Sequence, residues 1–257
     1  MPPVLFEIKD AIAIIALNRP DKLNAFNREM AFLLQEKLDE CRSSEIRCVF
    51  ITGTGKGFSA GQDLAEISAI SNRSFDKILI EYYNPIVTRI RKLEKPVMAA
   101  INGVAAGAGA NIALCCDIVV ASQSASFIQS FSKIGLIPDS SGSYVLPRLI
   151  GWQKASALMM LADKISSEEA LQLGMIYKVF PDEYFAESSK KIAETLAQMP
   201  TRGLGFIKQA LNSSFTNSLE DQLSAEQKWQ QKAGKTYDFN EGVKAFLEKR
   251  APRFRGE

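Results

Sequence analysis

The sequence predicts an α/β fold, in which short buried strands alternate with amphipathic helices over the first two thirds of the chain. Apolar runs rich in Ile and Val recur at residues 4–8, 12–17 and 48–52. Stretches with apolar residues three and four positions apart follow them, as in helices that bury one face. At residues 98–111 a small apolar run breaks into closely spaced glycines and then continues as a helix-like run. This alternation is typical of layered α/β domains.

The first elements can be assigned in order. Residues 4–8 and 12–17 predict a β-hairpin, and residues 18–24 predict a loop because Asn, Pro and Asp cluster there. Asn27 can cap a helix that runs to about Arg42. The apolar face of that helix comprises Met30, Leu33, Leu34 and Leu38.

The middle of the chain continues the pattern. Residues 48–52 predict a buried strand that ends in the glycine-rich stretch 53–57. Ser74 can cap a second helix, and Pro96 begins the next strand. The apolar stripe of the second helix comprises Ile78, Tyr82, Ile86 and Ile90. Two more strands are expected, at residues 117–121 and 126–131.

The last third is mainly helical. Loop residues 135–143 lead into an amphipathic stretch at 144–150, and the helical pattern resumes at Trp152. Ser166 or Ser167 can cap a helix over 168–173, which Gly174 stops. A last strand is expected at 176–180. The remainder, 184–256, predicts helices separated at Pro200, Gly205 and Gly234.

Composition limits the possible functions. The 257 residues are 46% hydrophobic and 23% charged, with a net charge of +2, which suits a globular protein and gives no sign of a nucleic-acid surface. No apolar run approaches the roughly 20 residues of a membrane helix, and no signal-type segment opens the sequence. We therefore expect a cytoplasmic protein without membrane or nucleic-acid partners.

The types of catalytic side chain are also limited. The chain has no histidine, which excludes Ser-His-Asp and Cys-His catalysis, His general bases and His-based zinc sites. Acid–base chemistry must then come from Asp, Glu, Lys, Tyr or Cys. The four cysteines show no metal-ligand spacing and are expected to be reduced and buried. No metal and no cofactor is expected.

The glycine turn within residues 98–111 is the main candidate for a binding site. It contains Gly103, Gly107 and Gly109. A strand, a glycine turn and a helix point free backbone N–H groups at a ligand. A tight crossing of packed elements would explain the glycines equally well. Because residues 58–63 also follow a buried strand and a glycine-rich turn, the two turns together could place two N–H groups on one oxygen.

Two nucleotide-binding motifs can be discounted. Gly107 and Gly109 resemble the start of a dinucleotide fingerprint, but the third small residue would be Ile112, and no acidic residue lies about 20 positions further on. Gly55-Lys56 resembles a phosphate loop, but its first glycine would be Phe50, and no Ser or Thr follows the lysine.

Six short motifs together resemble the crotonase (enoyl-CoA hydratase/isomerase) superfamily, in the order of that family. The motifs are Asn18-Arg-Pro with Leu23-Asn-Ala-Phe, Phe58-Ser-Ala-Gly-Gln-Asp-Leu, Lys95-Pro-Val, Asn102-Gly-Val-Ala-Ala-Gly-Ala-Gly, Cys116-Asp-Ile-Val-Val-Ala and Phe246-Leu-Glu-Lys-Arg. The resemblance implies a crotonase-like spiral of ββα units over residues 1–195. It also implies a C-terminal helical region, 196–257, that builds a homotrimer or a dimer of trimers.

The same resemblance implies that a coenzyme A thioester is the substrate, with its thioester oxygen held by two backbone N–H groups. By motif, those donors would be Ala60 and Ala108. Hydratases of the family use two glutamates to handle water, and this chain has Asn111 and Phe131 at those positions. An amide and a phenyl ring cannot serve as acid or base.

Asp139, in Gly-Leu-Ile-Pro-Asp, lies where isomerases of the family place an acidic residue. By itself it could equally be a solvated loop residue or a helix cap. A proton that leaves one carbon and returns to another needs only one carboxylate. The chain is most similar to the branch that converts ring-1,2-epoxyphenylacetyl-CoA to oxepin-CoA in phenylacetate degradation and that also shifts enoyl-CoA double bonds. Ser140-Ser141 departs from the small residue and Gly usual there, which affects the expected loop shape.

Further residues are assigned to the substrate site by the resemblance and by position. Arg19, Lys22 and Lys56 would meet the phosphates, although a lone surface cation is more often simply solvated. Lys249 resembles a residue that family members present from a neighbouring subunit, and Gln62 and Asp63 would mainly fix their loop. The other residues predicted to contact the substrate are Ala25, Leu64, Gly107, Phe131 and Phe246. Several aromatic side chains suggest a pocket with room for a flat acyl group. They are Phe26, Phe75, Tyr83 and Phe131.

Other functions remain open at this stage. The chain could be an enoyl-CoA hydratase or a Δ3,Δ2-enoyl-CoA isomerase of fatty-acid oxidation. Some crotonase-like proteins bind RNA or act as structural subunits, but the near-neutral charge argues against RNA.

Overall fold

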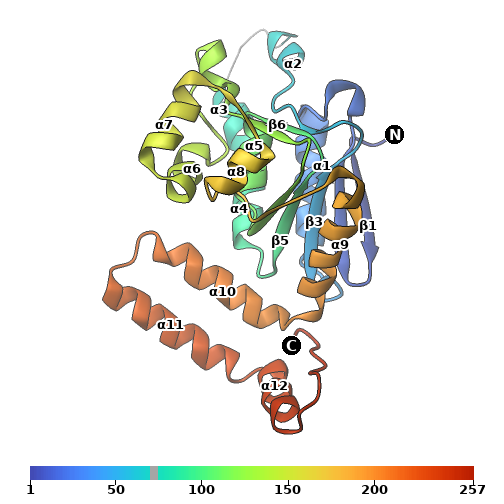
Figure 1. The fold of residues 1–257 in the computed structure, drawn as a ribbon, viewed down its shortest axis with the longest axis vertical. Helices are drawn as coiled ribbons and strands as arrows, with labels where there is room; N and C mark the ends of the chain where they lie inside the picture. The colour runs from blue at the N-terminus through green and yellow to red at the C-terminus, as the bar shows by residue number, and fades with distance from the viewer. Residues whose placement is uncertain (70–74) are drawn as a thin grey trace.

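The computed structural model describes residues 1–69 and 75–257, without the side chains of 67–69, 75 and 76. Its body contains two β-sheets covered by helices, and three C-terminal helices extend away from that body (Figure 1). Ser74, the predicted helix cap, and the side chain of Phe75 lie outside the described part.

The larger sheet has the strand order β1-β2-β3-β5-β7-β10. The predicted hairpin is present: β1 and β2 pair antiparallel, with Val4 opposite Leu17. From β2 onward every pairing is parallel. The strands are β1 (Val4–Lys9), β2 (Ile12–Leu17), β3 (Cys48–Gly53), β5 (Val97–Ile101), β7 (Ile118–Ser122) and β10 (Lys178–Phe180).

The smaller sheet consists of short strands, of which only β8 was predicted, as part of the strand expected at 126–131. Its order is β4-β6-β8-β9, with β4 (Gly57–Ser59), β6 (Val104–Ala106), β8 (Ser126–Ile128) and β9 (Lys164–Ser166). Each of β3, β5 and β7 is followed by one of these strands, so successive units add one strand to each sheet and then a helix. This is the predicted spiral of ββα units.

Most helices begin and end where sequence signals place them. The Asn27 side chain accepts the backbone N–H of Met30 at 3.0 Å and caps α1. The body contains α1 (Arg28–Glu40), α2 (Leu64–Ala69), α3 (Phe75–Ile78), α4 (Asn84–Lys92), α5 (Ala108–Leu114), α6 (Gly142–Ile150), α7 (Trp152–Leu161), α8 (Ser167–Gln172) and α9 (Asp182–Gln198). Short turns of other helix types are η1 (Pro20–Lys22), the π-helical η2 (Leu79–Tyr83) and η3 (Ser130–Ile134).

Two predicted boundaries were wrong. The strand expected at 126–131 ends at Ile128, and the chain then forms the η3 turn. The helix expected after Asn111 starts earlier, at Ala108, directly after the glycine turn. This shift makes Ala108 the first helical residue, whose N–H group has no acceptor inside the helix.

The inner strands of the larger sheet, β2, β3, β5 and β7, are buried on both faces, which explains their continuous apolar sequences. On one face α9 packs Phe185, Ala193 and Ala197 against side chains such as Met98 and Val120. The other face packs against α1, α4, α5 and the smaller sheet through the main core cluster. The active-site candidates are therefore carried by turns between two rigid layers.

The C-terminal helices are α10 (Thr201–Ser214), α11 (Leu219–Ala233) and α12 (Tyr237–Leu247). The prediction of a break at Gly205 was wrong, because this residue is buried inside α10. A Cβ atom there would lie 2.6 Å from the carbonyl oxygen of Glu94. Gly205 therefore allows α10 to approach the body closely and does not end a helix.

Candidate active site

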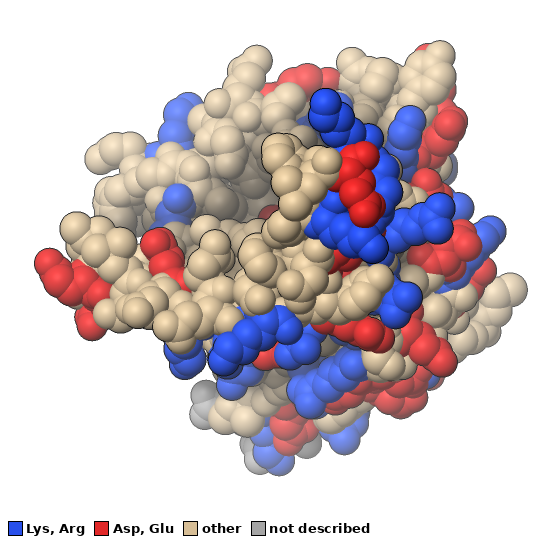
Figure 2. All heavy atoms as spheres, turned by 90° about the horizontal axis from the view of Figure 1, so that it is seen from below, with Lys and Arg blue, Asp and Glu red and all other residues tan. Residues whose placement is uncertain are grey.

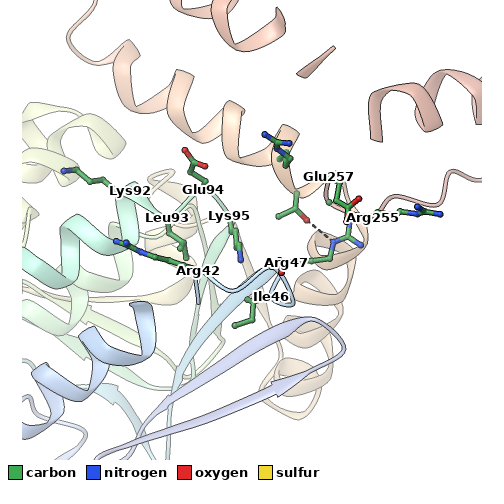
Figure 3. A pocket seen from close by; sticks show the side chains of 13 residues that line it. Arg42, Ile46, Arg47, Lys92, Leu93, Glu94, Lys95, Arg255 and Glu257 are labelled. Atoms are coloured by element: carbon green, nitrogen blue, oxygen red, sulfur yellow. Dashed lines mark hydrogen bonds between the residues drawn. The ribbon is translucent and has the colours of Figure 1, made fainter. Parts of the chain in front are cut away.

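Two cavities that adjoin the two-sheet body are candidates for the functional site, whereas larger grooves lie on the C-terminal helical region. The larger, of about 520 Å³, lies between the body and the start of α10 and contains Arg42, Arg47, Lys92 and Lys95 (Figure 3). Arg47 donates to Thr201 and to the carbonyl oxygens of Met199 and Phe254. The Lys92 and Arg42 side chains point outward in Figure 3. This cavity therefore joins two parts of the chain through hydrogen bonds and does not present converging groups to a ligand.

The smaller cavity, of about 90 Å³, contains half of the predicted site residues. It lies where β4 and β6 end and α5 begins. Seven predicted site residues line it: Ala60, Gln62, Leu64, Gly107, Ala108, Phe131 and Asp139. The other lining residues are Gly61, Ile78, Leu79, Tyr83, Ser130, Ile134 and Leu136. A mostly apolar pocket with a few converging polar groups is typical of small-molecule sites.

The glycine turn satisfies both earlier interpretations at different positions. A Cβ atom on Gly109 would lie 2.6 Å from Ser59 Cβ, so this glycine permits a tight crossing of α5 over β4. Gly107 and Ala108 instead face the cavity. In the described chain the N–H of Ala108 has no hydrogen-bond acceptor, as expected at the first position of a helix. The Ala108 N–H is thus available to donate a hydrogen bond to a negatively charged oxygen.

Ala60 does not fit its predicted role. Its N–H donates to the carbonyl oxygen of Leu23 at 2.8 Å, so it cannot also bind a ligand oxygen without breaking that bond. The neighbouring backbone explains why: residues 58–61 cross over the loop that precedes α1. The free N–H group of this segment belongs to Gln62, two residues further on.

The geometry around Phe26 directs the Gln62 N–H. Phe26 and Gln62 form a parallel bridge, in which Phe26 donates to Gly61 O at 2.6 Å and accepts from Asp63 N at 2.8 Å. Successive N–H groups of an extended chain point to opposite sides, so the Gln62 N–H points away from Phe26. It has no acceptor in the described chain. A Cβ atom on Gly61 would lie 3.4 Å from Ala108 N, so the two free donors belong to adjoining turns.

Asp139 is the carboxylate of the cavity. Burial raises the pKa of its carboxyl group, and a hydrogen bond from Ser140 Oγ, at 2.8 Å, acts in the opposite direction. Within the described chain no Lys or Arg lies within ion-pair distance of it. A carboxylate with a raised pKa in an apolar pocket is suited to proton transfer.

Asn111 holds the Asp139 loop and is itself unavailable to a substrate. It is fully buried. Its Nδ2 donates to the backbone oxygen of Asp139 at 2.8 Å, and its Oδ1 accepts from Gln129 Nε2 at 2.8 Å. Phe131, at the other position where the resemblance places a glutamate, contributes only its ring to the cavity wall. Neither residue replaces a second carboxylate.

The loop after Asp139 is strained. Ser140 and Ser141 have φ angles of 50° and 68°, in the left-handed region that non-glycine residues rarely occupy. The Ser141 hydroxyl is buried without a partner in the described chain. Backbone strain of this kind is common at functional sites, where the surrounding structure holds the strained residues in place. Here the Asp139 carbonyl oxygen accepts hydrogen bonds from Asn111 Nδ2 and Gly142 N, and these two bonds fix the loop.

The predicted cations differ in availability. Arg19 already pairs with Asp63 at 2.8 Å and donates to Ala25 O at 2.5 Å, and this pairing lowers the pKa of the Asp63 carboxyl group. Arg19, Ala25 and Asp63 therefore fix the loop beside the cavity. Lys22 and Lys56 are exposed, and neither forms an ion pair within the described chain.

Three predicted residues lie away from this cavity within the single chain. Phe26 is fully buried and supports the cavity wall from behind. Phe246 is 82% exposed and borders an apolar groove of the helical region. Lys249 is exposed just after α12. None of the three lines the cavity.

The remaining polar candidates are inert. All four cysteines are free and buried, and burial raises the pKa of Cys41 and Cys48 to about 12, which keeps both as thiols. Among the described residues no cluster of His, Cys, Asp or Glu could hold a metal ion. None of the helices in that part of the chain has both the length and the apolarity needed to span a bilayer.

With this geometry in place, comparison with known proteins identifies the class. The Enoyl-CoA hydratase/isomerase profile matches residues 7–257. The chain therefore belongs to the enoyl-CoA hydratase/isomerase family of the crotonase superfamily and has its fold.

Individual relatives carry different names. The chain is 46% identical to the 1,2-epoxyphenylacetyl-CoA isomerase of Escherichia coli, over 99% of this chain and 98% of the relative. It is 41% identical to a Rhodobacter capsulatus protein named as a probable enoyl-CoA hydratase, over 98% of each. A solved enoyl-CoA hydratase from Bacillus anthracis superposes with a TM-score of 0.93 at 31% identity, covering 99% of this chain and 100% of the other.

Proposed function

We propose that this protein is an acyl-CoA isomerase whose acid–base group is Asp139, and that its substrate is 1,2-epoxyphenylacetyl-CoA, which it converts to oxepin-CoA. The observation that carries the proposal is that Asp139 is the single carboxylate lining the cavity among the described residues. The Asn111 side chain is buried and hydrogen-bonded within the protein, and Phe131 is apolar. The 46% identity to an enzyme of that name supports the choice of substrate.

The proposed chemistry needs two functions from the protein. For a double-bond shift, Asp139 takes a proton from one carbon of the acyl group, and the electron pair of the broken C–H bond moves toward the thioester oxygen. The N–H groups of Gln62 and Ala108 stabilise the negative charge on that oxygen. Asp139 then returns the proton to another carbon. Gln62 replaces Ala60 in this scheme because the Ala60 N–H is already bonded.

The phosphates would lie outside the cavity. A volume of about 90 Å³ is too small for coenzyme A, so most of the substrate must extend out of the cavity. Lys22 and Lys56 are the exposed cations on the flanking loops, and we assign the phosphate contacts to them in preference to the paired Arg19. No cofactor besides the substrate's own coenzyme A is required.

The test is a pair of assays on the purified protein. We expect conversion of enzymatically prepared 1,2-epoxyphenylacetyl-CoA to oxepin-CoA, followed by chromatography, and only slow hydration of crotonyl-CoA. Brisk hydration of crotonyl-CoA, or no conversion of the epoxide, would contradict the assignment. A shift of a 3-enoyl-CoA double bond without epoxide conversion would indicate a Δ3,Δ2-enoyl-CoA isomerase.

One observation favours a second candidate, an enoyl-CoA hydratase, because a relative with 41% identity bears that name. Hydration must activate a water molecule and protonate a carbon, which usually takes more than one acid–base group. Asp139 would have to do both. The crotonyl-CoA assay above decides between the two candidates.

We further propose that the chain forms a homotrimer or a dimer of trimers through its helical region. Phe206 and Trp229 stack on each other with ring centroids 5.5 Å apart, but other apolar side chains there are widely exposed. These are Ile207, Leu211, Leu219, Leu223, Phe246 and Leu247. So much exposed apolar surface indicates an interface, and a monomer in light scattering at about micromolar concentration would contradict it.

A further inference from the structure

Tyr83 is a buried polar residue whose role the proposed reaction leaves open. Its side chain lines the cavity and is 1% exposed. Its hydroxyl group donates to Gln62 Oε1 at 2.5 Å, the shortest class of neutral hydrogen bond. Gln62, which accepts this hydrogen bond through its side chain, also presents a free backbone N–H group to the cavity.

An irregular helical turn brings Tyr83 to this position. The π-helical η2 joins α3 to α4, and its wider turn buries Tyr82 and Tyr83 together. Such turns are rare and often occur at functional sites.

The surrounding contacts form a closed unit. The Phe26 ring packs edge-on against Tyr83, with centroids 5.9 Å apart, and Gln62 Nε2 donates to Phe26 O at 3.1 Å. Phe26 is also the residue whose backbone bridges Gln62. Both ends of the Gln62 amide are therefore fixed by hydrogen bonds within the protein.

We propose that Tyr83 is a positioning residue, which fixes the Gln62 N–H toward the thioester oxygen through its hydrogen bond to the Gln62 side chain. This inference rests on the proposed function, since it assumes an acyl thioester in the cavity. Tyr83 remains a proton donor to Gln62, because burial and the nearby Asp139 charge raise its pKa. It makes no covalent contribution to the reaction.

Tyr83→Phe removes only the hydroxyl group, and Tyr82→Phe is its matched control. Tyr82 is adjacent and also buried, and its hydroxyl makes no hydrogen bond in the described chain. We expect Tyr83→Phe to lower kcat about tenfold, the usual worth of one neutral hydrogen bond, with little change in KM. Tyr82→Phe should retain the parent kcat. Equal losses in both variants would overturn the proposal.

A second readout reports on the oxyanion directly. The carbonyl carbon of 13C-labelled phenylacetyl-CoA, a non-reactive analogue, should shift in the NMR spectrum when the parent protein binds it, because N–H donors polarise the thioester. We expect Tyr83→Phe to reduce this shift and Tyr82→Phe to keep it. If the parent shows no shift, the proposed oxyanion site itself fails. If the parent shifts and Tyr83→Phe matches it, only the role of Tyr83 is overturned.

A double-mutant cycle tests whether the effect passes through Gln62. Gln62→Met keeps the backbone N–H and removes the side-chain acceptor. If Tyr83 acts only through that side chain, Tyr83→Phe should add less than about twofold to the loss in kcat already caused by Gln62→Met. Full additivity of the two losses would contradict the proposal.

Discussion

Two partly buried aspartates, Asp117 and Asp139, have opposite surroundings. Asp117 precedes β7, and its carboxylate pairs with Lys208 at 2.8 Å and Arg91 at 3.2 Å and accepts the Val97 N–H at 2.9 Å. The carboxyl group of Asp139 receives one hydrogen bond, from Ser140, and in the described chain it has no cation within ion-pair distance. Asp117 fastens α4, β5 and α10 together, whereas Asp139 faces an apolar cavity.

The difference shows that burial alone does not identify a functional carboxylate. A buried charge whose partners are all supplied by the protein has no remaining capacity for a substrate. In a buried carboxyl group without a cation, desolvation disfavours the ionised form and raises the pKa, so the group can exchange a proton near neutral pH. Charged side chains of both signs are also present at the surface, where solvent and each other are their partners: Figure 2 shows Lys and Arg interspersed with Asp and Glu on the face seen from below.

The largest expected effect is on activity at Asp139. Asp139→Asn keeps the size of the side chain and removes the base, so kcat for isomerisation should fall by about a hundredfold to ten-thousandfold. Affinity for a non-reactive acyl-CoA should change little. Asp117→Asn is the matched control and, in the fraction that folds, should retain the parent kcat. A parent-like kcat in Asp139→Asn would refute the assignment of the base.

The backbone donor beside Asp139 comes next. Proline fits the first position of a helix, so Ala108→Pro should fold while it removes the N–H group. We expect kcat to fall by about a hundredfold or more, the usual cost of one oxyanion donor. Ala108→Ser keeps the N–H and serves as control. If circular dichroism shows a folded Ala108→Pro protein with full turnover, another group holds the oxygen.

At the structural carboxylate the effect should appear in stability. Lys208 is 4% exposed and also donates to Ile90 O at 2.6 Å. Lys208→Met should lower the free energy of unfolding by about 3 kcal/mol, at the low end for a broken buried pair because Arg91 remains near Asp117. The exposed Lys154→Met is the control in urea titrations. A loss below about 0.5 kcal/mol, as at a surface site, would contradict this role.

The pH dependence separates the two carboxylates further. Because the folded-state pKa of Asp139 is raised, its stabilising contribution is present at low pH and is lost as pH rises through that pKa. Turnover runs in the opposite direction, since the base must be ionised, and should decline on acidification at a higher pH than for an ordinary aspartate. Measurement of kcat/KM between about pH 4 and about pH 8 locates this acid limb. Near neutral pH, Asp139→Asn should be at least as stable as the parent.

The smallest effect concerns the strained loop. Ser141→Gly relieves a left-handed φ of 68° and removes an unpaired buried hydroxyl, so it should stabilise the fold by about 1 kcal/mol. Turnover should be unchanged. Ser140→Gly relieves a similar φ but removes the hydrogen bond to Asp139, and should move the acid limb of the rate profile to higher pH. Identical rate profiles in the two variants would show that the Ser140 hydroxyl has no influence on the base.

Local signals determined a large part of this protein. The hairpin, the cap at Asn27 and the buried strands at 48–52 and 117–121 follow from periodicity and turn chemistry, which act between near neighbours. The absence of histidine limited the candidate bases, and the motif order predicted the family and the fold. Asp139 was found in this way, as were Ala108, Gly107 and Phe131 in the cavity wall.

Contacts between distant segments determined the rest. The strands of the smaller sheet have only three residues each, too few to show a period. The Ala60 N–H is bonded to Leu23, 37 residues earlier by the printed numbering, and Arg19 is paired with Asp63. Neither partner can be read from a single sequence.

The pKa of Asp139 and the free N–H of Gln62 are likewise properties of the packed molecule. Desolvation depends on every segment that closes over the carboxyl group, and a backbone donor is free only when no neighbouring strand or loop takes it. The sequence determined which chemical groups this protein has for its reaction. The tertiary structure decided which of them are bonded and which face the cavity, because hydrogen-bond satisfaction and burial are settled between segments far apart in the chain.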